Sequence, residues 1–193
     1  MKKTTMLILA IVAVVVIWAI SGYNGLVSLD EKVSSQWANV ETTYQRRADL
    51  IPNLVNTVKG YAAHEQETLA AVTEARANAT SISVDPSTAT AEDMERYMAA
   101  QQEVGSALGR LIAISESYPD LKANQNFLEL QSQLEGTENR ISTERKRYNE
   151  IVKEFNVKCR RFPTNIIAGI FGFDLKSMFE AQEGSEVAPV VEF

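Results

Sequence analysis

The chain opens with an apolar run that is long enough to enter a lipid bilayer. Two lysines precede this run, and every residue from Met6 to Ile20 is apolar. A helix over residues 4–25 would be about 33 Å long, which exceeds the roughly 30 Å thickness of the hydrocarbon layer. The sequence therefore predicts a short basic N-terminus at residues 1–5 and a transmembrane helix at residues 6–27.

The residues at the ends of this helix predict how it sits in the membrane. Trp18 and Tyr23 have the amphipathic rings that are enriched at membrane–water interfaces, so we expect them to lie there. Lys2 and Lys3 lie before the helix, whereas only Lys32 follows within twenty residues. This asymmetry favours a cytoplasmic N-terminus and a body on the extracytoplasmic, periplasmic side. The predicted membrane-anchor residues are Met6, Trp18, Ile20 and Tyr23.

A cleaved signal peptide is the alternative interpretation of the same run. Ala19 and Ser21 are the small residues that signal peptidase requires before a cleavage site. Apolar residues at helical spacing nevertheless continue from this point into the polar part of the chain. We therefore expect a retained anchor whose helix runs on into the body of the protein.

Helical spacing of apolar residues dominates the rest of the chain. Between Leu26 and Val72 the apolar positions recur at spacings of three, four or their sums, which predicts one long helix. Pro52 falls inside this pattern without shifting it, so we expect a kink there; a break near Ile51 is the alternative. Two further helices are expected after the loop at residues 81–91, the first patterned in heptads.

The last predicted long helix carries an aromatic and aliphatic row that repeats every seven residues. It is expected to begin at Pro119, which suits the first position of a helix, and to end at Pro163. The row consists of Phe127, Leu134, Ile141, Tyr148, Phe155 and Phe162. We predict an all-α fold: a transmembrane helix that continues into a long antiparallel bundle of three long helices plus a short C-terminal helix. Residues 181–193 are expected to form a disordered tail.

A short, strongly apolar segment follows the last long helix. It needs a covering surface, which could be the bundle itself, a second subunit or the membrane interface. Its predicted docking residues are Ile166, Ile170, Phe171, Phe173 and Phe179.

The composition argues against several classes of function. The net charge is −6 and no basic face is evident, so we expect no binding to nucleic acid. The sequence contains none of the common phosphate-binding or nucleophile motifs. A di-iron bundle would need two Glu-x-x-His pairs, and the chain has one histidine. We therefore expect no enzyme activity, no metal and no cofactor.

Four ordered segments of the chain resemble the signature segments of the LemA family. They are residues 46–55, 58–61, 118–124 and 134–141, and Arg147–Asn149 and Phe171–Phe173 fit the same pattern. The resemblance implies a LemA-like helical bundle, here at residues 28–180, behind one N-terminal membrane helix. It implies no particular reaction.

Charged residues within these segments are the candidate site. They are Arg46, Arg47, Asp49 and Pro52 in the first helix, and Glu135, Glu138 and Arg140 in the last long helix. Glu135 and Glu138 share a helix face because they are three residues apart. We expect a partly buried ion-paired network in which Arg46 or Arg47 pairs with one of these carboxylates. A partner or ligand site at the kink and a catalytic carboxylate pair are the alternatives.

These observations predict a non-enzymatic, single-pass membrane protein of the bacterial cell envelope. Its extracytoplasmic bundle would be an interaction or assembly scaffold that forms homo-oligomers. The lipid bilayer is the expected partner, and the sequence does not identify other envelope proteins. The alternative is an envelope sensor that transmits binding at the Arg46–Pro52 kink to the membrane helix.

Overall fold

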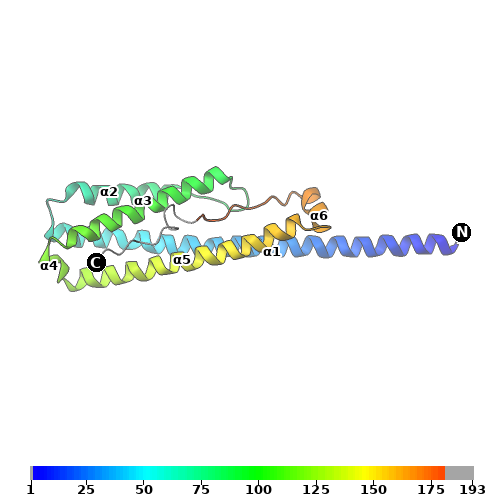
Figure 1. The fold of residues 1–193 in the computed structure, drawn as a ribbon, viewed down its shortest axis with the longest axis horizontal. Coiled ribbons are helices and arrows are strands. Elements are labelled where there is room, and N and C mark those ends of the chain that lie inside the picture. Colours follow the sequence, from blue (N-terminus) through cyan, green and yellow to red (C-terminus); the bar gives the residue numbers. More distant parts are fainter. Residues whose placement is uncertain (1, 181–193) are drawn as a thin grey trace, which may run out of the picture.

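A computed structural model describes residues 2–180, and all regular elements in this range are helices (Figure 1). They are α1 (Lys2–Tyr61), α2 (Gln66–Ser81), α3 (Ala91–Ser115), α4 (Pro119–Lys122), α5 (Gln125–Arg160) and α6 (Thr164–Phe171). The predicted all-α fold is thus confirmed. The tail expected at residues 181–193 lies outside the described residues.

The first part of helix α1 is apolar and exposed, and the rest of the helix forms part of the core of the bundle. It is one helix of 60 residues, about 90 Å long, and its first part extends beyond the other helices (Figure 1). The side chains from Met6 to Ile17 are all exposed, whereas Leu26 is completely buried. Among the described residues, α1 is the one helix long and apolar enough to cross a membrane. Full burial in the bundle begins at Leu26, two residues before the predicted boundary.

The prediction of one helix from Leu26 to Val72 is wrong. Helix α1 passes through Pro52 without a break and ends at Tyr61; the chain then reverses at residues 62–65 into α2. The apolar spacing persists across the reversal because Leu69 and Val72 fold back onto the core cluster that holds Leu54 and Val58. The bundle therefore contains a fourth principal helix, the shorter α2, in addition to the three long ones.

Two boundaries of the last predicted helix are also different. Pro119 begins the four-residue α4, and α5 begins only at Gln125, where the side chain of Asn124 accepts a hydrogen bond from the Phe127 amide at 3.0 Å. The helix ends at Arg160, so Phe162 lies outside it and is 77% exposed rather than part of the core row. Proline at position 163 prevents the row from continuing.

The helices pack around α1 as a spine. Helix α1 contacts both α2 and α5, and α3 packs against α2 (Figure 1). One core cluster, at the membrane-helix end of the bundle, contains Trp37, Tyr44, Tyr97 and Tyr148. The other cluster, toward α4, contains Leu54, Leu111 and Phe127 among its fully buried residues. Both clusters draw on α1, so every layer of the core depends on it.

Residues 173–180 form an extended segment, here called the C-terminal strap, that lies along α5. Asn156 donates to the Lys176 carbonyl and accepts from the Lys176 amide, each at 2.9 Å. Asn149, two turns earlier, does the same for Phe179, with both distances at 2.8 Å. An extended chain without a neighbouring strand must find such partners for its backbone. The two asparagines therefore bind the strap through its main chain.

Side chains of the strap complete its attachment. Phe179 is buried and stacks on Trp37 with ring centroids 5.7 Å apart. The buried ammonium of Lys176 forms an ion pair with Asp30 of α1 at 2.7 Å. The strap therefore covers the aromatic cluster of its own bundle, and Gly172, with φ of 72°, makes the left-handed turn that leads into it.

Asn149→Ala tests the role of the asparagines. The substitution leaves the amide and carbonyl of Phe179 without partners, so we expect a loss of about 1–3 kcal/mol in the free energy that holds the strap in place. Hydrogen exchange of the Phe179 amide measures this as faster exchange. Asn139→Ala, at an exposed position of α5, is the control and should leave the exchange unchanged. Equal protection in all three proteins would contradict this account.

Candidate functional site

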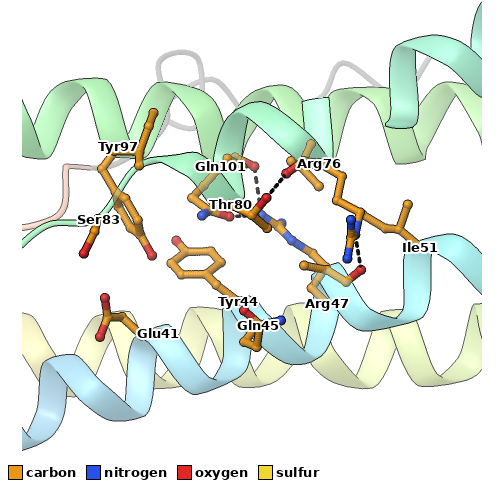
Figure 2. Close-up of a pocket in the computed structure, with 14 residues that line it drawn as sticks. Glu41, Tyr44, Gln45, Arg47, Ile51, Arg76, Thr80, Ser83, Tyr97 and Gln101 are labelled. Carbon is orange, nitrogen blue, oxygen red and sulfur yellow. Dashed lines mark hydrogen bonds between the residues drawn. The ribbon is translucent and has the colours of Figure 1, made fainter. Parts of the chain in front are cut away.

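Arg47 is a buried cation that connects three helices. Its side chain is 4% exposed and donates from Nη1 to Oε1 of Glu138 on α5 at 2.8 Å. From Nη2 it donates to the main-chain and side-chain oxygens of Gln101 on α3, at 2.9 and 2.7 Å (Figure 2). The guanidinium also lies over the ring of Tyr44, 5.1 Å from its centroid. One side chain of α1 thus holds α3 and α5 at a defined register.

The energetics of this contact favour a positioning role. Burying a charged side chain costs several kcal/mol in lost hydration. The attraction to its partners offsets this cost only when the hydrogen-bond geometry is good. Glu138 is 47% exposed, so water screens its half of the pair. The pair therefore adds little net stability, but any arrangement that left Arg47 buried without acceptors would be strongly disfavoured.

Pro52 creates a second polar contact, between α1 and α2. Proline has no amide hydrogen, so the carbonyl of Ala48 loses its partner within the helix. Arg76 of α2 donates from Nε to this carbonyl at 2.7 Å (Figure 2). The exposed ring of Pro52 therefore does not interrupt α1; it frees an acceptor that helps to dock α2.

A small cavity of about 190 Å³ lies between α1, α2 and α3, beside Arg47 and Arg76 (Figure 2). The rings of Tyr44 and Tyr97 meet there edge to face, with centroids 5.7 Å apart. Burial raises the pKa of both phenols and of the Glu41 carboxyl at the rim. The raised pKa values favour the neutral form of both phenols near neutral pH.

A larger open groove of about 1020 Å³ lies between α3 and α5, on the other side of Arg47. Apolar side chains in it are Leu108, Ile112, Leu134 and Ile141, and its carboxylates include Glu135 and Glu138. Gly105 and Gly109 flatten the α3 wall; a Cβ added at Gly109 would meet no atom within 4 Å. Leu108, Leu134 and Ile141 are buried, so these apolar side chains offer little exposed area, and the Arg47–Glu138 pair gives the groove a fixed polar contact.

The structure joins only some of the residues predicted for the site. Arg47 and Glu138 are paired. Arg46 donates instead to Gln133 at 3.3 Å, and Asp49 accepts from Gln45 at 2.7 Å. Glu135 accepts from Gln131 at 3.1 Å and lines the groove, while Arg140 is exposed. Glu135 and Glu138 therefore have different partners.

Several residues of the site have no distinct signal in the sequence. Gln101 and Arg76 lie among other polar residues of amphipathic helices, and nothing in their spacing marks them as partners of α1. The free carbonyl that Pro52 creates was a usable signal, because a buried acceptor must find a donor. Within residues 2–180, no group of three histidine, cysteine or acidic side chains could hold a metal ion.

Removing either partner of the Arg47–Glu138 pair should have unequal effects. Glu138→Leu leaves a buried cation without its counter-charge, and we expect a loss of about 2 kcal/mol. Arg47→Met leaves a half-exposed carboxylate that water can solvate, with a loss of about 1 kcal/mol or less. Urea unfolding of the full chain in detergent, followed by circular dichroism, measures both. Glu135→Leu is the control and should change little; the reverse order for the pair would contradict this account.

Comparisons with known proteins agree with the resemblance described from sequence. The model of the LemA family matches residues 36–193, a range that includes Arg47, Pro52 and Glu138. Magnetosome protein MamQ 1 of Paramagnetospirillum magneticum is 25% identical over 186 residues, which cover 88% of this chain and 68% of that protein. Protein LemA of Metamycoplasma hominis is 26% identical over 160 residues, covering 83% and 69% respectively. The chain belongs to the LemA family.

Proposed function

We propose that this protein is a single-pass membrane protein whose helical bundle is an assembly module of the cell envelope. The observation that carries the proposal is the continuity of α1, which is bare and apolar at residues 6–20 and forms the core of the bundle from Leu26 onward. A rigid helix shared by anchor and bundle fixes the height and orientation of the bundle above the bilayer. The basic N-terminus favours a bundle on the extracytoplasmic side.

The groove between α3 and α5 is the proposed docking face for a second copy of the chain. The open groove presents polar side chains of both helices, such as Gln102 and Glu135, and the Arg47–Glu138 pair gives it a fixed polar feature that selects a register. Anchored copies share the plane of the membrane, so their grooves lie at the same height. This arrangement raises the effective concentration of one bundle near another.

Filling the groove should weaken self-assembly without harming the fold. A leucine at position 109 enters open space on the α3 wall and improves helix propensity, so Gly109→Leu is expected to fold normally. The same change in α5, Gly136→Leu, is a matched control because a Cβ there also meets nothing within 4 Å and Gly136 does not line the groove. Light scattering of the full chain in detergent measures the mass.

We expect wild type and Gly136→Leu to be oligomers and Gly109→Leu to shift toward monomer. A monomeric wild type, or an oligomer that Gly109→Leu leaves intact, would contradict assembly through this face. The groove would then be open for a different partner.

The second candidate function is an envelope sensor, and the position of Arg47 favours it specifically. A ligand that changed the spacing of α3 and α5 would act on Arg47, and thereby on the helix that enters the membrane. The two functions differ in one outcome. A sensor requires Gly109→Leu to change an envelope phenotype while the oligomeric state stays the same, whereas an assembly module requires both to change together.

A further inference from the structure

Helix α6 lies where the bundle ends and α1 continues alone (Figure 1). The ring of Phe171 packs against Tyr23 of α1 with centroids 4.8 Å apart, and the side chain of Ile167 covers Gly22. About 20 helical residues cross the hydrocarbon layer, so a span that begins after Thr5 ends near Gly25. Helix α6 would therefore lie at the boundary between hydrocarbon and head groups.

The outer face of α6 and the turn before it are apolar and exposed. Phe162 is 77% exposed, Ile170 72%, Phe171 58% and Ile166 50%. Their inner neighbours Ile167 and Ala168 are buried against the bundle, so the helix is already docked; Phe162, Ile166 and Ile170 remain largely exposed, and Phe171 exposes the part of its ring that Tyr23 does not cover. An apolar surface at this height fits the boundary of a bilayer better than it fits water.

A cavity of about 710 Å³ lies beside this face, between α1 and the corner where α5 leads into α6. Lys32, Lys158 and Arg161 line it, together with one carboxylate, Glu154. Within residues 2–180, none of these three cations forms an ion pair. Val157 and Phe162, both largely exposed, form its apolar side. The cavity thus offers unpaired positive charge next to an apolar surface, in a chain whose net charge is −6.

We propose that this corner is a binding site for an anionic phospholipid of the surrounding bilayer. Lys32, Lys158 and Arg161 bind the head-group phosphate, and the acyl chain lies along Phe162 and the outer face of α6. The height of the cavity matches a head group because Gly25, at the end of the span, lines it. This inference rests on the proposed membrane anchor and adds a lipid class to it.

Lipid retention in native mass spectrometry tests the site. The full chain is extracted from vesicles that contain equal amounts of phosphatidylglycerol and phosphatidylcholine, and the two lipids that remain bound are compared. We expect wild type to retain phosphatidylglycerol selectively. Neutralising the cavity with K32Q, K158Q and R161Q should reduce the selectivity by about fivefold for each charge removed.

The matched control removes three exposed cations far from α6, with K59Q, R110Q and K146Q, and should keep the selectivity of wild type. Equal retention in the two triple variants would overturn the site. A second result would also overturn it: the protein binds glycerol phosphate in pure phosphatidylcholine vesicles and shows no preference for phosphatidylglycerol in the mixed vesicles. The ligand would then be a soluble phosphate. A protein that fails to float with vesicles at all would instead contradict the anchor.

An environment-sensitive fluorophore tests the contact of α6 with lipid directly. Ile170→Cys in a Cys159→Ser background carries the label, and Ser132→Cys, exposed on α5, is the control position. We expect nitroxide-labelled lipids in the vesicles to quench the label at position 170 and not at position 132. A label at position 170 that nitroxide lipids leave unquenched would overturn the proposal, whether water or a second copy surrounds it.

Discussion

The hydrogen bonding of a helix to itself is the constraint on which this structure depends. Because every interior amide of α1 has a partner within the helix, the same element can pass from lipid into water without exposing an unpaired backbone group. The chain uses this property over 60 residues, and both core clusters are built on the result. The exposed apolar segment and the spine of the bundle are therefore one continuous helix.

Polar contacts then determine how the other elements sit on that spine. Arg47 reaches α3 and α5, and the carbonyl freed by Pro52 receives Arg76 from α2. Asn149 and Asn156 hold the strap by its main chain. Apolar burial drives these elements together but tolerates sliding, whereas a buried cation or carbonyl has few acceptable positions. Of these contacts, Arg47 spans the groove between α3 and α5, because it bonds to both Gln101 and Glu138.

The sequence predicted the fold class, the apolar helix and most of the core, because helical periodicity reports which face of a segment is buried. It failed where periodicity carries no information. Leu69 lies eleven residues after Val58, a spacing of about three turns, so the reversal at residues 62–65 resembled a continuing helix. Gly60, just before the reversal, was the one local residue that disfavours a continuing helix. Pairings such as Arg47 with Gln101, and the asparagines with the strap, depend on tertiary proximity that spacing along one helix cannot reveal.

The continuity of α1 between lipid and bundle is the central claim, and a distance between two spin labels tests it most directly. With Cys159 replaced by serine, labels at Ala13 and Asn53, both exposed, bracket the membrane boundary and Pro52 in the full chain in lipid nanodiscs. An unbroken helix predicts a single narrow distribution near 60 Å, from about 1.5 Å for each of the intervening residues. A broad distribution, or one centred well below this distance, would show a hinge between anchor and bundle and contradict the account.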